Sequence, residues 1–370
     1  MERSLVIVGA GIAGLATGCY ARLNGYPTTI LEMHSIPGGL CTAWTRKGYT
    51  FDTSMHMLVG SKGGPLHRMW QELGAVGDDR EFFYHGDEIV RVESGGKALS
   101  ITTDARVLEE RMRELSPADE KLIRQFTRLV AGRDLMGAMS LKPSELSGPV
   151  DKLKMMLAML PLMPTFLKYG KTTIQEFAAR FRDPFLRDAV RFYIDSPGWP
   201  MVRFPMAALS GMSRSGVLEA GVPLGGSKPV IDRMAEYYRK LGGKVQYNSR
   251  VTDIIVENDR AIGVRLAEGT EARADEVVWA ADGRTAIFDI LGGRYAGNDI
   301  RNMYENWIPV LPLVQVMIGV ARDMSREPYR VIFEAQEPIT IGGEEHRWLT
   351  VLHRGYDPSM APAGKSAVEV

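Results

Sequence analysis

Three glycines and one acidic residue near the N-terminus have the types and spacing of a phosphate-binding motif. Gly9, Gly11 and Gly14 follow one apolar run, and Glu32 follows a second. Gly9 allows a tight turn, Gly11 lets the backbone approach a pyrophosphate, and Gly14 lets a helix pack closely against a strand. A carboxylate at Glu32 accepts hydrogen bonds from ribose hydroxyls and repels a 2′-phosphate. The pattern predicts a site for an unphosphorylated adenosine dinucleotide, and the alternative is a glycine-rich turn in an ordinary strand–helix unit.

The elements that must position this motif form a strand–helix–strand unit. Residues 5–8 are an apolar run suited to a buried parallel strand, residues 12–24 are expected to form a helix, and residues 28–31 the next strand. The start of the helix, with Ile12 and Ala13, directs free N–H groups and the positive end of the helix dipole at the phosphates. The sequence therefore predicts an α/β, Rossmann-like fold.

A second glycine pair, Gly38 and Gly39, follows this unit. It offers another place where the backbone can press against a phosphate or a flavin ring, and the alternative is a loop with two structural glycines. Residues 48–56 are Gly-Tyr-Thr-Phe-Asp-Thr-Ser-Met-His. The whole stretch resembles the flavin-dependent amine oxidase and phytoene desaturase superfamily, and its last part is most similar to carotenoid desaturases, carotenoid isomerases and retinol saturases. Leu40 stands where many members of this family carry an arginine.

The second half of the chain supports the same resemblance. Gly225-Gly226-Ser227 leads into an expected helix over residues 228–241, with Ser227 as its N-cap. Strands are expected at residues 245–247, 251–257, 261–266 and 276–279. In the family, the residue matching Val251 touches the adenine through its backbone, and the turn matching residues 280–283 lies near the pyrophosphate. The resemblance therefore covers residues 1–60 and 220–295.

This resemblance implies FAD as the cofactor and a fold of the glutathione-reductase type. The positions expected to contact FAD are Gly9, Gly11, Ile12, Ala13, Gly14, Glu32, Met33, Gly38, Gly39, Leu40, Val251 and Asp282.

The chain is expected to divide into a discontinuous cofactor domain and a substrate domain. Residues 1–64 and 220–295 form the FAD-binding domain, residues 65–219 form a helical lid and part of the substrate domain, and residues 296–370 add an antiparallel sheet. Residues 365–370 alternate polar and apolar side chains, as a strand does. Because family members usually continue into a further flavin-contacting motif, we expect a C-terminally truncated chain.

Composition narrows the classes of partner and the cellular location. Lys and Arg together number 45, as do Asp and Glu, so no net basic field recommends nucleic acid as a partner. Cys19 and Cys41 do not have metal-ligand spacing, and we expect neither a metal site nor a disulfide. A reducing, cytoplasmic location is expected, without a cleavable signal peptide, because the apolar N-terminus runs directly into the glycine motif.

One apolar, methionine-rich segment over residues 152–168 carries lysines at both ends. It is shorter than the roughly 20 apolar residues that span a bilayer, and Pro161 and Pro164 interrupt it. The segment is expected either to lie in a membrane interface and admit a lipid, or to form a buried helix of the lid whose lysines reach solvent.

Catalytic residues carry a weaker signal than the cofactor motif. His56 is the best single candidate for a polar group near the flavin, able to exchange a proton with a substrate carbon, and the alternative is a structural histidine. Asp52 is expected to fix its loop by hydrogen bonds. The proline and aromatic cluster over residues 197–205 is expected to line the substrate cavity or to shape a turn.

Three functions follow from these observations. The first is an FAD enzyme that adds or removes hydrogen across carbon–carbon bonds of a polyene or another isoprenoid lipid, or isomerises them. The second is a flavin amine oxidase, which requires an aromatic cage around the amine. The third is a non-catalytic escort of prenylated proteins, like the Rab GDP-dissociation inhibitors, although the intact glycines and Glu32 oppose it. The residues do not select the redox direction or the external electron acceptor or donor.

Overall fold

Four parallel strands form the central sheet of the cofactor half in the computed structural model, which describes residues 3–77, 82–84, 86, 88–102, 104–132, 142–193, 203–209, 220–307 and 314–370. Their order is β13–β1–β2–β9. The strands are β1 (Leu5–Val8), β2 (Thr28–Leu31), β9 (Lys244–Gln246) and β13 (Glu276–Trp279). Strands from residues 1–64 and from residues 220–295 thus pair in one sheet, and Leu5 lies opposite both Thr28 and Glu276.

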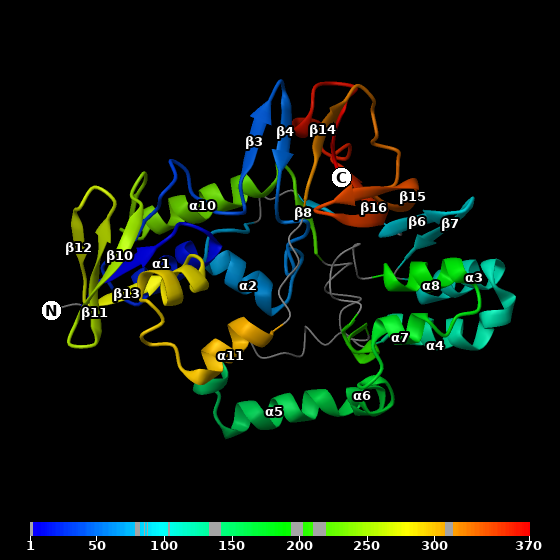
Figure 1. Cartoon of the computed structure of the whole chain (residues 1–370), viewed down its shortest axis with the longest axis horizontal. Helices are drawn as coiled ribbons and strands as arrows, with labels where there is room; N and C mark the ends of the chain where they lie inside the picture. The colour runs from blue at the N-terminus through cyan, green and yellow to red at the C-terminus, as the bar shows by residue number, and fades with distance from the viewer. Residues whose placement is uncertain are drawn as a thin grey trace.

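Two different layers cover the faces of this sheet (Figure 1). Helices α1 (Ile12–Leu23) and α10 (Ser227–Lys240) cover one face, where Ile7 and Ile30 pack against Leu15 and Met234. An antiparallel meander covers the other, where Val6 and Val8 meet Val264 and Leu266. The meander strands are β10 (Val251–Glu257), β11 (Arg260–Leu266) and β12 (Glu271–Arg273). The alternation of side chains along β1 therefore supplies both cores.

A second, six-stranded sheet has the order β14–β17–β16–β15–β6–β7. It is antiparallel except for the β15–β6 pair, which is parallel. Its strands are β6 (Val90–Ser94), β7 (Lys97–Ile101), β14 (Met317–Val320), β15 (Arg330–Ile341), β16 (Glu344–His353) and β17 (Ser366–Glu369). Segments that are far apart in the sequence therefore share this sheet, because β6 and β7 come from the first half of the chain and the other four strands from its end.

Helices pack beside the second sheet and extend below it (Figure 1). Among the described helices, five α-helices share a core with β6 and β7: α3 (Ala105–Leu115), α4 (Glu120–Val130), α6 (Met163–Tyr169), α7 (Ile174–Ala178) and α8 (Pro184–Arg191). Further helices are α2 (Pro65–Glu72), α5 (Pro149–Met159), α11 (Asn298–Asn306) and a π-helix over Thr285–Ile290. Phe126, Phe177 and Phe181 are fully buried in this core.

Short strand pairs connect the two sheets. A hairpin of β3 (Ala43–Arg46) and β4 (Tyr49–Asp52) projects from the cofactor half, and β4 packs against β17. Strand β5 (Phe82–Phe83) pairs with β8 (Val222–Pro223). These connections place the end of β4 and the start of α10 next to the second sheet (Figure 1).

The sequence predictions for the cofactor half agree with these elements, with one correction. Residues 5–8, 28–31 and 276–279 form strands within the predicted bounds. The prediction of Ser227 as an N-cap is wrong: Gly226 is the N-cap, and Ser227 is the first residue of α10. The helix begins one residue earlier than predicted, and hydrogen bonds donated by the Ser227 N–H and hydroxyl direct this residue toward the carboxylate of Asp52.

Candidate functional site

In the glycine loop between β1 and α1, the space beside Gly11 is not filled by other atoms of the protein. A Cβ at Gly9, where φ is +98°, would lie 3.2 Å from the Ala280 carbonyl oxygen, and one at Gly14 would lie 1.9 Å from the Gly9 carbonyl oxygen. At Gly11 the nearest atom to a Cβ would be the Gly38 oxygen, 3.9 Å away. The fold therefore requires glycine at Gly9 and Gly14, whereas the space beside Gly11 fits a bound pyrophosphate.

The first turn of α1 faces this space. Its first helical hydrogen bond runs from the Leu15 N–H to the Gly11 carbonyl, 3.0 Å long. The N–H groups of Ile12 and Ala13 come before that bond, so they have no acceptor within the helix. With the positive end of the helix dipole, they provide the donors that an anion at this position needs.

Hydrogen bonds to Glu32 connect the glycine loop to the end of β2. Its buried carboxylate accepts hydrogen bonds from the Ala10 N–H (2.7 Å) and the His34 N–H (2.8 Å), one on each oxygen. Each carboxylate oxygen has a further lone pair, which suits the two hydroxyls of a ribose. The structure therefore places Glu32 next to the glycine loop, as the sequence predicts.

The second glycine pair lies directly against the first motif. The Gly38 N–H donates to the Ala10 carbonyl (2.9 Å), and Gly11 and Gly38 form a parallel bridge. Gly38 and Gly39 have φ values of +128° and +58°, which favour glycine. A Cβ at Gly39 would lie 3.6 Å from the Gly11 Cα. The two glycine motifs, separate in the sequence, thus form one backbone surface.

Residues from the second part of the predicted cofactor domain, residues 220–295, complete the edge of this surface. The Ser249 N–H donates to the Glu32 carbonyl (2.8 Å), which brings the start of β10 and Val251 next to the end of β2. The turn after β13 places Ala280 against Gly9. Asp282 in this turn accepts a hydrogen bond from the Thr285 N–H (2.7 Å), and that bond lowers the pKa of its carboxyl group. Asp282 therefore binds the first residue of the π-helix beside the glycine loop.

Met33 and Leu40 lie at the same edge but are exposed to solvent. Leu40 is 83% exposed and Met33 is 54% exposed. Both flank the second glycine pair, between β2 and β3. Because both side chains are exposed, they are accessible to a ligand bound at this edge.

Asp52 joins the cofactor half to the second sheet. Its buried carboxylate, at the end of β4, accepts hydrogen bonds from the Ser227 N–H (2.7 Å) and the Ser227 hydroxyl (2.5 Å). A second carboxylate, that of Asp357, accepts from the Gly225 N–H (2.6 Å). Asp52 therefore fixes its loop by hydrogen bonds, as expected, and two acidic side chains hold the start of α10.

His56 lies in the loop that follows Asp52. Its Nδ1 is buried and has no hydrogen-bond partner among the residues that the structure describes. Burial lowers the pKa of His56, and the positive charges of Arg354 and Arg330 lower it further, whereas Asp52 opposes the shift. His56 is therefore a neutral imidazole at pH 7, with one nitrogen available to a ligand or a water.

A buried ion pair next to His56 was not expected from the sequence. The guanidinium of Arg354, 5% exposed, lies 3.4 Å from the carboxylate of Glu369 and donates to the Tyr356 hydroxyl (3.1 Å). Burial raises the pKa of Glu369, and Arg354 opposes that shift. No motif marks these residues; the only sequence signal is the charged side chain at residue 369 within a segment with strand alternation.

Aromatic side chains pack around this ion pair. Phe83 and Tyr356 are stacked with ring centroids 4.0 Å apart, and Tyr329 lies 5.5 Å from Tyr356 and 5.9 Å from Phe83. Rings at 4.0 Å are in direct contact, so no substrate fits between them. Of the cluster over residues 197–205, residues 197–202 lie outside the described residues.

A histidine of the second sheet gives the fold a pH dependence. Buried His353 accepts a hydrogen bond from the Gly355 N–H (3.1 Å) at Nδ1, and its Nε2 donates to the Glu327 and Pro328 carbonyls. Burial lowers its pKa below the ordinary 6.5. The unfolded chain therefore takes up a proton first as the pH falls, and the folded state loses stability below about pH 6.5 by up to roughly 1.4 kcal/mol per pH unit.

Urea unfolding at pH 7 and pH 5 tests this expectation. We expect the free energy of unfolding to fall between these values, and the variant His353→Asn, which keeps an acceptor for Gly355 but does not titrate, to fall less. Glu369 contributes in the opposite direction, because a raised carboxyl pKa stabilises the fold as the pH falls. Comparing the two proteins removes that contribution, and equal pH slopes would contradict the assignment.

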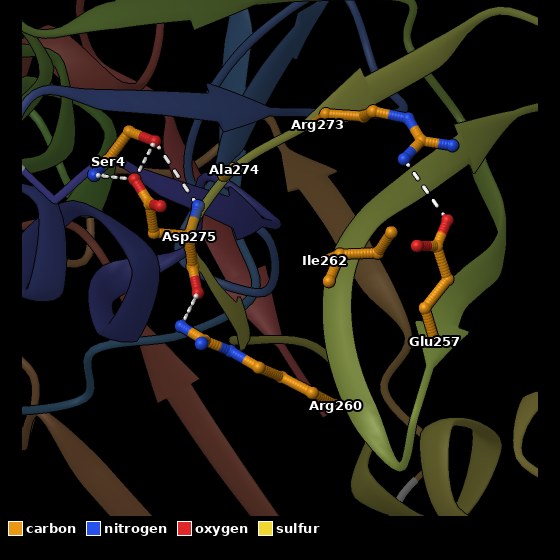
Figure 2. Close-up of a pocket in the computed structure, with 7 residues that line it drawn as sticks. All are labelled: Ser4, Glu257, Arg260, Ile262, Arg273, Ala274 and Asp275. Atoms are coloured by element: carbon orange, nitrogen blue, oxygen red, sulfur yellow. Dashed lines mark hydrogen bonds and ion pairs between the residues drawn. The ribbon is translucent and has the colours of Figure 1, made fainter.

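An open hollow lies on a different part of the surface (Figure 2). It measures about 500 Å³ and is lined by Ser4, Glu257, Arg260, Ile262, Arg273, Ala274 and Asp275. Its charges are already paired: Arg273 with Glu257 at 3.2 Å, and Arg260 with the Asp275 carbonyl at 3.0 Å. It contains none of the predicted site residues. No group of three or more potential metal ligands occurs in the described part of the chain.

Comparison with known proteins agrees with this geometry. The chain is 26% identical over 298 residues to a phytoene desaturase (lycopene-forming) of Pseudescherichia vulneris, covering 80% of this chain and 59% of the relative. It is 24% identical over 331 residues to a chloroplastic prolycopene isomerase of Daucus carota, covering 87% of this chain and 53% of the relative. The chain thus spans between half and two thirds of the length of these relatives.

Solved structures share the fold at lower identity. The PF1083 protein of Pyrococcus furiosus has a TM-score of 0.65 and 18% identity, covering 99% of this chain and 78% of that one. A RAB GDI of Plasmodium falciparum has a TM-score of 0.58 and 12% identity, covering 100% of this chain and 82% of that one. The expected α/β fold of the FAD-binding type is confirmed, and these likenesses alone do not separate an enzyme from an escort.

The family comparison decides the class of cofactor. The family described as flavin containing amine oxidoreductase matches residues 12–370, which include Gly14 of the first glycine motif, the second glycine pair and the second sheet. A flavin on a dinucleotide site is FAD, so the expected cofactor is confirmed. The chain belongs to the flavin containing amine oxidoreductase family.

Proposed function

We propose that this chain is an FAD-dependent oxidoreductase that desaturates, saturates or isomerises carbon–carbon double bonds of an apolar polyene of the carotenoid type. The observation that carries the proposal is the joined glycine surface, with open space beside Gly11, in a chain whose relatives are named as carotenoid desaturases and isomerases. FAD supplies the hydride chemistry when bound, and the protein supplies binding, orientation and proton transfer.

The residues divide these tasks between the two halves of the site. Gly11 and Gly38 with the first turn of α1 hold the pyrophosphate, Glu32 holds the ribose, and Val251 lies beside the adenine. His56 is proposed as the polar group at the reacting end. As a neutral imidazole it can accept a proton from a substrate carbon or return one, since its Nδ1 has no protein partner among the described residues.

The division of the chain into domains belongs to the same proposal. Residues 1–64 and 220–295 bind the cofactor, and residues 65–219 with residues 296–370 form the substrate side. The shared six-stranded sheet supports treating those last two segments as one folding unit, because β6 pairs with β15.

The amine oxidase alternative has an electrostatic difficulty. An amine substrate is a cation at neutral pH, and the guanidinium of Arg354 is buried close enough to His56 to lower its pKa. The aromatic rings nearby are packed on one another instead of forming an open cage. Among the described residues, the guanidinium beside His56 and the stacking of these rings on one another favour a neutral substrate over an ammonium ion.

The visible absorption spectrum of the purified protein, with the mass of the released cofactor, tests the proposal first. Flavin bands and the mass of FAD are the expected result. Anaerobic turnover of phytoene and of prolycopene in detergent, with and without a quinone as electron acceptor, then tests the substrate class. A protein that binds no FAD when FAD is added would support the escort alternative, and a flavoprotein that oxidises putrescine but neither polyene would support the amine oxidase alternative.

The location follows from the substrate. A polyene resides in lipid, so we propose peripheral contact with a membrane through residues 152–168, from the cytoplasmic side. Both cysteines are free, as a reducing compartment maintains them. Among the described helices, none combines the length and the apolar character that crossing a bilayer requires.

A further inference from the structure

The outer face of α5 and α6 carries an apolar stripe that the fold leaves in solvent. Val150, Leu153, Leu157 and Leu160 recur at intervals of three and four residues, which places them on one side of a helix. Leu153 is 51% exposed, Leu157 is 53% exposed, and no residue of α5 is buried. The stripe continues past the bend as exposed Met163 and Leu167, and together these residues are called the α5–α6 stripe. For α5 this exposure contradicts the alternative of a buried lid helix, whereas Leu162 in the same predicted segment is buried.

Lysines lie at both margins of the stripe. Lys152 and Lys154 directly precede and follow Leu153, so each is turned about 100° from it around the helix, one to either side. Both are exposed, and Lys168 lies exposed at the end of α6. When such a helix lies in a membrane surface, lysine side chains at its margins extend away from the apolar face and reach the lipid headgroups.

The charge of this segment selects one kind of partner. Residues 142–171 contain five lysines and two acidic residues, whereas the chain as a whole has a net charge of zero. One of the acidic residues, Asp151, is paired with Lys142 at 2.8 Å. A second copy of the chain on this face would bring lysines against lysines, whereas an anionic surface meets complementary charge.

We propose that the α5–α6 stripe lies in the plane of an anionic membrane surface, with its leucines and methionines among the upper acyl chains and Lys152, Lys154 and Lys168 among the headgroups. The bend at Pro161 and Pro164 fits an in-plane segment of two short helices. The proposed function gives membrane binding its purpose, because the membrane contains the apolar substrate, and the inference rests on the proposed function in this respect alone. The surface itself is independent of the cofactor.

Vesicle co-sedimentation of the full chain tests the proposal. We expect the protein to bind vesicles of phosphatidylcholine mixed with phosphatidylglycerol, to bind pure phosphatidylcholine more weakly, and to lose affinity as salt is added. The double variant Leu153→Gln/Leu157→Gln should bind at least about tenfold more weakly. Lys152→Gln/Lys154→Gln should lose about fivefold per lysine on anionic vesicles only.

Matched controls separate this surface from general effects. Leu23→Gln on α1 and Lys240→Gln on α10 change exposed residues of the same types outside the stripe, and both should bind like the unchanged protein. Because all these side chains are exposed, thermal unfolding should be the same for every variant. Binding that is absent, equal in stripe and control variants, or indifferent to phosphatidylglycerol would overturn the proposal. So would a dimer in solution that the leucine variants dissociate.

The same samples distinguish failure of this inference from failure of the proposed function. Flavin content and turnover of a polyene in detergent do not require a membrane. A flavoprotein that is active in detergent and fails to bind vesicles overturns the membrane surface alone. A protein that binds anionic vesicles through the stripe and contains no FAD overturns the proposed function alone.

Discussion

Gly11→Val is expected to yield a folded protein that contains no FAD. The Gly11 backbone has φ of −71° and ψ of −178°, which any residue adopts, so the change introduces no backbone strain. Its side chain occupies the space beside the loop that no protein atom fills. A pyrophosphate needs that space to reach the N–H groups at the start of α1. Gly11→Ala, whose methyl group meets no protein atom closer than 3.9 Å, should weaken FAD binding with even less effect on the fold.

Gly297→Val provides a matched control. Gly297 is the N-cap of α11, as Gly11 is of α1, with nearly the same backbone angles (φ −68°, ψ 171°) and no atom within 4 Å of a Cβ. Replacing an N-cap glycine costs about 1 kcal/mol in either helix, so the two variants should unfold alike. Flavin absorbance per protein should vanish for Gly11→Val and remain for Gly297→Val. Flavin retained in Gly11→Val at the level of the control would refute the assignment of the pyrophosphate site.

The local sequence predicts the cofactor half well because its signals are short-range. A glycine motif, an apolar run and a terminal acid lie within one strand–helix–strand unit, and the bounds of β1 and β2 follow from them, while a separate apolar run gives those of β13. The sequence predicts a second phosphate- or flavin-binding position at Gly38 and Gly39, and the bridge between Gly11 and Gly38 is seen only in the structure. Ser227 shows the limit of this reasoning, because its hydroxyl is directed to Asp52, 175 residues earlier in the chain, and the N-cap is Gly226.

The six-stranded sheet and the helices beside it are less predictable, because their organisation depends on distant pairings. The parallel pairing of β6 with β15 joins residues 240 positions apart, and no local pattern encodes it (Val331 pairs with Arg91). The environment of α5 is undetermined for the same reason: an apolar stripe with flanking lysines is compatible with a core or with an exposed surface, and only the tertiary structure distinguishes them. The local sequence likewise does not predict the ion pair between Arg354 and Glu369, because each residue by itself has the sequence context of an ordinary charged residue.

Arg354→Met is expected to destabilise the fold strongly. Arg354 and Glu369 are each about 5% exposed, so removing the guanidinium leaves a buried carboxylate that, within the described part of the chain, accepts a hydrogen bond only from the Gln315 amide. Breaking one side of a buried ion pair costs about 3–5 kcal/mol. Urea unfolding at pH 7 measures the loss. The variant Lys240→Met, which breaks an exposed pair with Glu236, should show no measurable change.

The double variant Arg354→Met/Glu369→Leu separates charge from packing. Replacing both partners by apolar residues removes the unpaired charge, so we expect much of the lost stability to return. If the double variant is as unstable as Arg354→Met, the guanidinium acts through packing against Tyr356 instead of through its charge.

The same double variant also tests whether the ion pair acts on His56, because Arg354 lowers the pKa of His56. In the double variant, the imidazole of His56 should therefore titrate at higher pH. NMR measures this titration, with the five other histidines of the chain as internal references. An unchanged His56 pKa would show that the ion pair supports the sheet without acting on the proposed proton-transfer residue.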